Sequence, residues 1–371
     1  MIGQLKLPAD GICENIQYTN FTLHSELHYW SSEMTAAATA VLVLLAIFGF
    51  LGAVINTIVF YALFKVKIGS RLTSTLMQSQ CVFNGFTCLV VFLYKVSGSR
   101  ITTGHIWWDT FFCYLWNDDI LMWFGVAGGL CNAMCISIGH AIAVFFPVFY
   151  KMYQIYLMWA LLIYVIVIDI LLYIPIPMAR IYVNGICQYA TSFSSITLEQ
   201  FITVERYMWL ALGIVSPVSV IVVAHTSVIV YIYRHWKLSD ANKKAQMSTS
   251  EEQLWRMRKR MKEIALSTAA VAGTLLICNA FDITTYVLQS AGLYKYINLS
   301  LSQQAGVVPI IMSSCIVPCI LVASIKSVRR YFLENVIFGL LVKFGLRQRG
   351  SCMSTRSQSE ADWTANNVNP E

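Results

Sequence analysis

The sequence predicts an all-α membrane protein, a bundle of seven transmembrane helices followed by an amphipathic helix on the membrane surface. Of its 371 residues, 57% are hydrophobic and 12% are charged, and the mean hydropathy is +0.62. A soluble domain carries about 25% charged residues, so most of this surface must face something other than water. The apolar residues come in blocks long enough to cross a hydrocarbon core, which takes about 20 residues of helix. A transmembrane β-barrel would show short alternating segments instead.

Seven apolar blocks divide the chain, and we take each as one transmembrane helix. The third is too long for a bilayer, and we expect its cytoplasmic end to continue as helix into water. The blocks run over Ala36–Val66, Thr73–Val96, Trp108–Phe146, Tyr156–Met178, Met208–Tyr233, Ile264–Gln289 and Gln304–Ile325.

These blocks define the expected organisation. An extracellular N-terminal segment (1–35) precedes the bundle (36–325), and the first helix is expected to act as the insertion signal because no apolar stretch lies before it. The stretch 326–344 carries Arg329, Arg330 and Lys343 among large apolar residues. This amphipathic pattern is typical of a helix lying on the membrane surface. The polar tail (345–371) is expected to be disordered.

The distribution of positive charge predicts the orientation. With the N-terminus outside, 20 of the 26 lysines and arginines fall in cytoplasmic loops or the C-terminal segment. Cytoplasmic loops of membrane proteins are enriched in these residues, so the net charge of +7 does not indicate nucleic-acid binding. Two glycosylation sequons, at Asn20 and Asn298, lie on the extracellular side of the same arrangement. We therefore expect an extracellular N-terminus and a cytoplasmic C-terminus.

Enzyme signatures are absent from the sequence. It contains no Walker loop, dinucleotide glycine pattern, HExxH motif or nucleophile elbow, and its six histidines lack metal-ligand spacing. We expect no enzymatic activity, no cofactor and no metal. A transporter is the main alternative, although paired halves with helices broken near the midplane are not evident. A seven-helix channel of the insect odorant type would place the N-terminus inside, against the charge distribution.

Short motifs recur in order along the helices. They include Ile55-Asn56-Thr57-Ile58-Val59, a helix-three segment from Ser137 to Pro147, Trp159, Pro217, and a helix-seven segment from Ser313 to Leu321. Together they resemble the GNxxV, DRY and NPxxY regions, the helix-four tryptophan and the helix-five proline of rhodopsin-like (class A) G-protein-coupled receptors. The resemblance spans the whole bundle and implies a plasma-membrane receptor that signals to a heterotrimeric G protein.

Several family motifs are degenerate here. The DRY position reads Gly139-His140-Ala141, and a histidine supplies neither a permanent charge nor a bidentate fork. Helix six carries Asn279 where the family has the CWxP motif, and helix two carries Asn84 where the family has an aspartate. Only Pro318 survives from NPxxY. The pattern resembles divergent orphan receptors of invertebrates.

The resemblance also implies roles for individual residues. Conformational switches are expected at Asn56, Asn84, Pro217, Asn279 and Pro318. The surface facing the G protein would include His140, Arg258, Lys259 and Lys262. The basic residues would also contact anionic membrane lipids, and phosphorylated serines in the tail would recruit an arrestin.

Cysteines supply two further expectations. The resemblance pairs Cys113 with Cys187 in an extracellular disulfide, and two free thiols, with Cys13 as the competing partner, are the alternative. Cys352 matches a palmitoylation position of the family, although a plain exposed cysteine fits equally well.

Acidic residues inside a membrane are candidate functional groups. We expect Asp119 to share a helical face with Trp123 and to bind a cationic ligand group, or else to lie in the wet interface, solvated or paired with Arg100 or Arg180. Asp282 and Tyr286 in helix six are assigned to the same ligand site. A peptide and a small molecule both remain open as the ligand.

Overall fold

The computed structural model describes residues 36–337 except for gaps at 67, 69, 99–100, 102, 117–118, 179, 184–185, 190–191, 194–195, 242–248 and 294–299. Within this part of the chain, seven helical segments are long and apolar enough to cross a membrane, which confirms the predicted seven-helix bundle. The helices are α2 (Ala36–Lys65), α3 (Arg71–Ser97), α4 (Ile106–Leu115), α5 (Ile120–Phe145), α6 (Pro147–Tyr173), α7 (Pro175–Met178), α8 (Leu198–Met208), α9 (Ser216–Ala241), α10 (Thr249–Ser290), α11 (Leu301–Ser324) and α12 (Lys326–Tyr331), with π-helical turns η2 (Trp209–Val215) and η3 (Phe332–Ile337).

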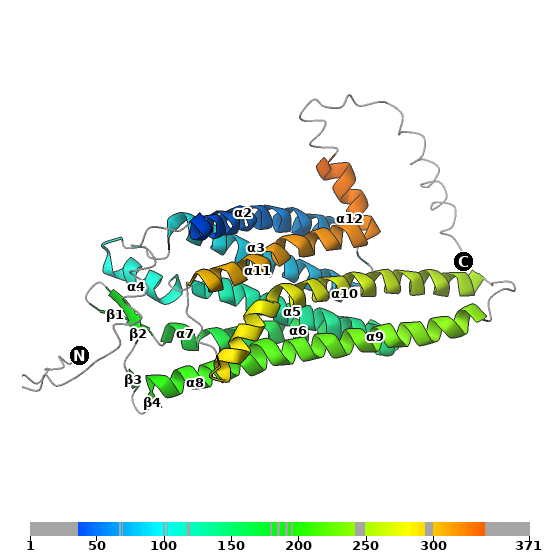
Figure 1. Ribbon diagram of the computed structural model, residues 1–371. Helices are drawn as coiled ribbons and strands as arrows, with labels where there is room; N and C mark the ends of the chain where they lie inside the picture. The colour runs from blue at the N-terminus through cyan, green and yellow to red at the C-terminus, as the bar shows by residue number, and fades with distance from the viewer. Residues whose placement is uncertain are drawn as a thin grey trace, which may run out of the picture.

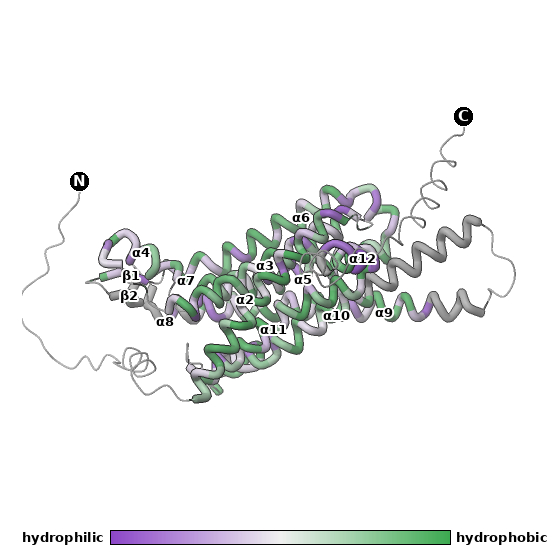
Figure 2. The backbone as a smooth tube through the Cα atoms, turned by 90° about the horizontal axis from the view of Figure 1, so that it is seen from above, coloured by the Kyte–Doolittle hydropathy of each residue, from purple (hydrophilic) through white to green (hydrophobic). Residues whose placement is uncertain are grey.

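The long helices lie side by side, and a small β-structure covers one end of the bundle (Figure 1). We call this end the hairpin end, and the opposite end, where α11 leads into α12, the α12 end. Helix α5 is central, because it packs against α3, α6, α9 and α10. Apolar residues run along all the spans and polar residues gather on α12 (Figure 2).

Small residues let the helices approach closely, as is common in membranes. A Cβ atom at Gly52 of α2 would lie 2.4 Å from Cys88 Sγ, and one at Gly125 of α5 would lie 2.3 Å from Thr87 Oγ1. A Cβ at Gly128 would lie 2.3 Å from Asp169 Oδ2. The glycines therefore set the contacts of α2 and α5 with their neighbours.

The third predicted span is broken near the hairpin end. Instead of one continuous helix, the chain forms the short α4 and then α5, and α5 ends at Phe145. Asp119, between them, has a left-handed backbone with φ of 58°. An aspartate tolerates this conformation better than most residues. The break lies at the hairpin end, and the expected extension of the other end of this helix into water stays a prediction.

The fourth span begins earlier than predicted. Helix α6 starts at Pro147, directly after Phe146 closes α5, so no long loop separates the two helices. Proline suits the first helical position because its missing N–H group has no partner there in any case. At the other end, Pro175 starts the separate turn α7. Residues 147–155, which we expected to form a loop, are helical.

The fifth span contains a distortion directly before Pro217. Helix α8 continues into the π-helical turn η2, and the N–H group of Ser216 donates to Ala211 O, five residues earlier. Pro217 has no N–H group to continue the regular pattern. This widened turn joins α8 to α9, so helix extends from Leu198 to Ala241, beyond the predicted block in both directions.

Two short antiparallel hairpins cover the hairpin end. Strands β1 (Arg180–Val183) and β2 (Ile186–Tyr189) form one, and β3 (Ser192–Phe193) and β4 (Ile196–Thr197) form the other. The disulfide Cys113–Cys187 joins α4 to β2, which confirms the predicted pair. Arg180 Nη1 also donates to Cys113 O at 3.2 Å, so β1 and β2 are both fixed to α4.

Helix α12 turns away from α11 at Ile325, whose backbone is extended (Figure 1). Val328 is fully buried against the bundle while Arg329 and Arg330 are exposed, which matches the predicted amphipathic character. The structure describes the expected surface helix as far as Ile337. The segment 1–35 and the tail 345–371 lie outside the described residues.

Candidate functional site

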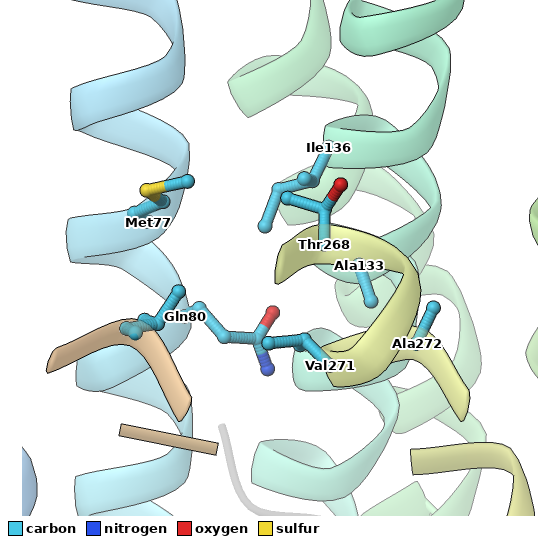
Figure 3. A pocket seen from close by; sticks show the side chains of 8 residues that line it. Met77, Gln80, Ala133, Ile136, Thr268, Val271 and Ala272 are labelled. Carbon is cyan, nitrogen blue, oxygen red and sulfur yellow. The ribbon is translucent and has the colours of Figure 1, made fainter. Parts of the chain in front are cut away.

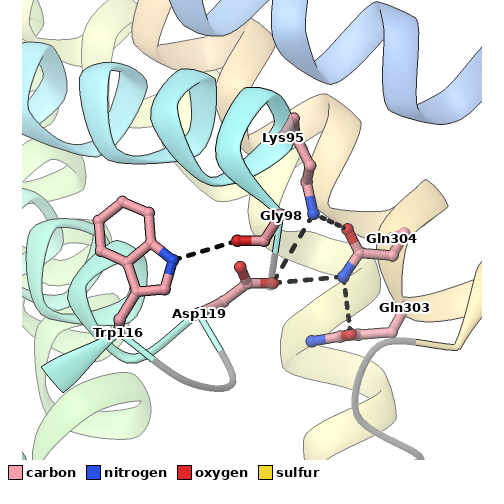
Figure 4. Close-up of polar contacts among 6 residues, drawn as sticks. All are labelled: Lys95, Gly98, Trp116, Asp119, Gln303 and Gln304. Carbon is pink, nitrogen blue, oxygen red and sulfur yellow. Dashed lines mark hydrogen bonds and ion pairs between the residues drawn. The ribbon is translucent and has the colours of Figure 1, made fainter. Parts of the chain in front are cut away.

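A buried polar group joins three helices at the hairpin end. We call it the Lys95 cluster, and it consists of Lys95 from α3, Asp119 before α5, and Gln303 and Gln304 from α11 (Figure 4). Lys95 Nζ lies 4.0 Å from Asp119 Oδ2, and the two side chains are 6% and 3% exposed. Lys95 Nζ donates to Gln304 Oε1 at 2.6 Å, and Gln304 Nε2 donates to Asp119 Oδ2 at 3.3 Å. A single amide therefore bridges the ion pair.

The charges fix the orientation of that amide. An ammonium group only donates and an ionised carboxylate only accepts, so the Gln304 oxygen must face Lys95 and its nitrogen must face Asp119. The same nitrogen donates to Gln303 Oε1 at 3.1 Å. Because both charges are satisfied across three helices, the cluster links α3, α5 and α11 to one another.

Local structure holds each member of the cluster in place. Lys95 lies in the last turn of α3, where the Gly98 N–H group closes the helix on Tyr94 O at 3.0 Å. Its ammonium group also lies 4.8 Å from the centre of the Tyr94 ring. Trp116 Nε1 donates to Gly98 O at 3.2 Å, which ties the break after α4 to the end of α3. At the start of α11, the Ser300 hydroxyl accepts from the Gln303 N–H group.

These contacts correct the expectation for Asp119. It precedes α5 with a left-handed backbone rather than sharing a regular helical face with Trp123. Its carboxylate lies 4.0 Å from Lys95 Nζ, a partner that we did not predict, whereas Arg100, one of the two proposed partners, lies outside the described residues. Trp123 packs against a second apolar cluster that includes Met122 and Val307. Sequence reasoning missed Lys95, Gln303 and Gln304; a lysine and a glutamine pair at opposite helix ends were the available signal.

Asp282 and Tyr286, one turn apart on α10, belong to a different group at the same end. Tyr286 Oη donates to the backbone oxygen of Arg206 in α8 at 3.4 Å. The charged groups of Glu205, Arg206 and Asp282 interact electrostatically with Tyr286. The four residues predicted to bind a ligand therefore divide between the Lys95 cluster, the apolar core and this contact between α8 and α10.

A second buried carboxylate lies at the hairpin end, where α4, the loop before it and β1 meet. Asp109 of α4 is 5% exposed and accepts from the N–H group and the hydroxyl of Thr103 at 2.6 and 2.9 Å. Tyr182 Oη donates to its other oxygen at 3.3 Å. Desolvation raises the pKa of Tyr182, and the nearby Asp109 carboxylate raises this pKa further. These bonds hold α4, the preceding loop and β1 together without joining transmembrane helices.

Amide side chains link the helices midway through the bundle. Asn56 Nδ2 donates to Gly52 O on its own helix and to Ser314 O of α11, both at 2.8 Å. Asn132 Nδ2 donates to Gln80 Oε1 at 2.9 Å, and Gln80 Nε2 donates to Asn84 Oδ1 at 3.2 Å. The predicted switch position Asn56 thus bonds to another helix directly, whereas Asn84 bonds to Gln80 of its own helix, which in turn reaches Asn132 of α5. The sequence did not single out Gln80 and Asn132.

Asn279 and Pro318 are less connected. Asn279 Nδ2 donates to Leu275 O of its own helix at 2.7 Å, and Pro318 is buried within α11. A small cavity of about 10 Å³ lies between α10 and the helices packed against it. It has room for roughly one water molecule. Its lining comes from α3, α5, α10 and α11 (Figure 3), and consists of Met77, Gln80, Ala133, Ile136, Thr268, Val271, Ala272 and Leu321.

Two histidines lie toward the α12 end. His140 Nδ1 is 2.9 Å from Ile136 O, and because a carbonyl only accepts, Nδ1 carries the proton. Ser137 Oγ donates its one hydrogen to Ala133 O at 2.8 Å, so His225 Nε2, at 3.0 Å from the same oxygen, must be the donor in that contact. The His140 ring is thereby held against its own helix, and its Nε2 has no hydrogen-bond partner among the described residues.

Several predicted positions cannot be located. Asn20, Asn298 and Cys352 lie outside the described residues. Arg258, Lys259 and Lys262 fall within α10, but their side chains are outside the described part. Among the described residues, no three His, Cys, Asp or Glu side chains gather as they would around a metal ion.

Comparison with known proteins supports the fold. No protein-family model matches the chain, and no curated protein matches it. Among solved structures, it is similar to the crystal structure of squid rhodopsin, with a TM-score of 0.64 and 15% identity over 92% of this chain and 95% of that one. At this identity the similarity concerns the fold alone. The resemblance inferred from the motifs is thus confirmed structurally: the chain has the seven-helix fold of squid rhodopsin.

Proposed function

We propose that the chain is a plasma-membrane receptor of the rhodopsin-like type, which binds an extracellular ligand and signals to a heterotrimeric G protein. The observation that supports this most is the seven-helix arrangement shared with squid rhodopsin over 92% of the chain. The positive charge of the loops favours the hairpin end as the extracellular one. Arrestin and anionic lipids are the further partners that we propose, together with glycans at Asn20 and Asn298 and a lipid anchor at Cys352.

The ligand is proposed to bind at the hairpin end, between α5, α8, α10 and α11. Two polar groups lie there, the Lys95 cluster and the contact between α8 and α10 at Tyr286. Polar groups in an otherwise apolar bundle are costly, and they often mark ligand sites. A peptide or a small molecule with polar groups would satisfy either one.

The G protein would bind at the α12 end, where His140, Pro318 and the basic start of α10 meet the cytoplasm. His140 stands where the resemblance places the arginine of the DRY motif. It supplies no permanent charge, and its ring is bonded to its own helix. Arg258, Lys259 and Lys262 would then supply the positive charge for this contact.

Dissociation of G-protein heterotrimers in cells that display the tagged chain tests this proposal. A resonance-energy biosensor would follow it at rest and against a library of peptides and amines, for the wild type and for His140→Arg. A signal above mock-transfected cells with any G protein supports a coupling receptor. Silence from both forms despite confirmed surface display contradicts coupling and favours a non-coupling receptor subunit or a transporter.

A further inference from the structure

We propose that the Lys95 cluster is the restraint that holds the resting arrangement of α3, α5 and α11, and that ligand binding releases it. This inference rests on the proposed receptor function and concerns the regulation of the same site. It places the controlling contact at the hairpin end of the bundle, at the opposite end from the degenerate Gly139-His140-Ala141 segment.

The cluster has the connectivity that a restraint needs. Its members come from the end of α3, the break before α5 and the start of α11, and the Lys95–Gln304 bond spans 209 residues of sequence. Lys95 and Asp119 are 6% and 3% exposed, and Gln303 and Gln304 are 4% and 2% exposed. Separating the two buried charges would leave each one uncompensated. Moving these three helices apart therefore costs free energy as long as water does not enter the cluster.

The cluster is also open to displacement. Charge-assisted N–H···O bonds are typically about 2.7–2.9 Å long, whereas the direct distance from Lys95 Nζ to Asp119 Oδ2 is 4.0 Å. The pair depends on the Gln304 amide, whose bond to Asp119 is 3.3 Å long. A ligand group that offers Asp119 a closer donor, or Lys95 a closer acceptor, would replace this bridge and gain energy in doing so.

Asp119 is placed to pass on the change. Its φ of 58° lies in the left-handed region, which an aspartate tolerates only at some cost. The contacts of its side chain within the Lys95 cluster hold this conformation. Asp119 directly precedes the first residue of α5. Release of Asp119 would free the first turn of α5, which is the central helix of the bundle.

The α12 end offers weaker control in the described structure. His140 bonds to Ile136 O and Ser137 to Ala133 O, both on α5 itself. The Ser137–His225 contact is the bond from this pair that crosses to another helix. These neutral bonds do not join three helices through opposite charges, as the Lys95 cluster does.

The test removes both charges together. Lys95→Met combined with Asp119→Leu removes both members of the ion pair, and such replacements of buried pairs are often neutral or stabilising. Asp109→Asn is the matched control. Asp109 is similarly buried at the same end, but its hydrogen bonds go to Thr103 and Tyr182, in the loop before α4 and in β1. If the double variant is not displayed, Gln304→Met removes the bridge and keeps both charges.

Two measurements are made on each form: hydrogen exchange of the purified protein at Val317–Ser324 of α11, and G-protein dissociation without ligand. For the double variant we expect both to rise by roughly fivefold or more, the lower end of typical allosteric coupling, with no change for Asp109→Asn. Wild-type exchange in a stable double variant would overturn the restraint. Faster exchange without dissociation in any form would leave the restraint standing and contradict G-protein coupling instead.

Discussion

The two ends of the bundle differ in how their polar groups are satisfied. At the hairpin end, Lys95, Asp119 and Gln304 come from three elements and satisfy one another across them. At the α12 end, His140 and Ser137 bond to carbonyl oxygens of their own helix, and one neutral bond, Ser137–His225, crosses to α9. The first end is tied by charge and by the Cys113–Cys187 disulfide, and the second by apolar packing and by neutral hydrogen bonds, such as those of the Tyr150 hydroxyl with Ser70 and Thr73.

This difference predicts where the molecule can move. Apolar contacts between helices in a membrane have little directional preference, whereas a bridged charge pair permits few geometries. A small rearrangement at the hairpin end would therefore produce larger displacements at the α12 end. A cavity of about 10 Å³ also lies beside α10, where it is lined by Thr268, Val271 and Ala272 among others.

The largest effect is expected from separating the charges of the Lys95 cluster. Lys95→Met removes the cation that lies 4.0 Å from the buried Asp119 carboxylate, and breaking a buried ion pair by removing one partner typically costs about 3–5 kcal/mol. We expect a lower melting temperature of the purified protein and reduced surface display. Adding Asp119→Leu should restore most of the loss. Equal melting temperatures for the wild type and the single variant would show that the pair carries little of the stability.

Loss of the disulfide is the next largest change. Cys113→Ser with Cys187→Ser removes a link between residues 74 positions apart and is expected to cost about 2–4 kcal/mol. Mutating both residues avoids a free thiol that could pair elsewhere. Thermal unfolding with and without reductant measures the effect: reductant should destabilise the wild type and leave the double variant unchanged. An effect of reductant on both forms would point to a different disulfide.

A smaller effect is expected at the α12 end from Ser137→Ala. This variant leaves the His225 Nε2–H donor without its partner and should cost about 1–3 kcal/mol. Combining it with His225→Leu removes the orphaned donor, so the double variant should lose less than the sum of the two single losses. Strict additivity of the melting-temperature changes would mean that the contact between α5 and α9 is not formed.

The smallest change in stability is expected for His140→Ala. Its ring bonds only to Ile136 O on the same helix, so the variant removes one local bond worth about 0.5–1.5 kcal/mol. Its melting temperature should stay close to that of the wild type, well above that of Lys95→Met. A decrease in melting temperature as large as that of Lys95→Met would contradict the proposed difference between the two ends.

The sequence predicted the number and order of the spans, since hydropathy and charge depend on composition alone. It placed helix ends less well at Asp119, Phe146 and Leu198. The apolar block from Trp108 to Phe146 contains a polar run, Asn117-Asp118-Asp119, directly after the end of α4, but we did not take this run as a helix break. The break depends on contacts formed after folding, including the Trp116–Gly98 bond and the disulfide at Cys113.

The candidate site was harder to predict because its parts are remote in sequence. Asp119 was selected as an acid in an apolar segment, but nothing local to it indicates that Lys95 and Gln304 lie beside it. Asn84 is a different case, because its partner Gln80 lies one turn away on the same helix, and only the next partner, Asn132, is remote in sequence. By contrast, the Cys113–Cys187 pair was predicted correctly, since the motif resemblance carried information about spatial proximity.

Hydrogen–deuterium exchange along the wild-type chain, in detergent and without ligand, tests the difference between the two ends most directly. We expect slower exchange in peptides that cover Ile120–Phe124 and Gln303–Val307, near the Lys95 cluster, than in peptides that cover Ser137–Phe145 and Leu321–Ser324 at the α12 end. Uniform exchange, or faster exchange near Asp119 and Gln304, would contradict the claim that the bundle is held at its hairpin end.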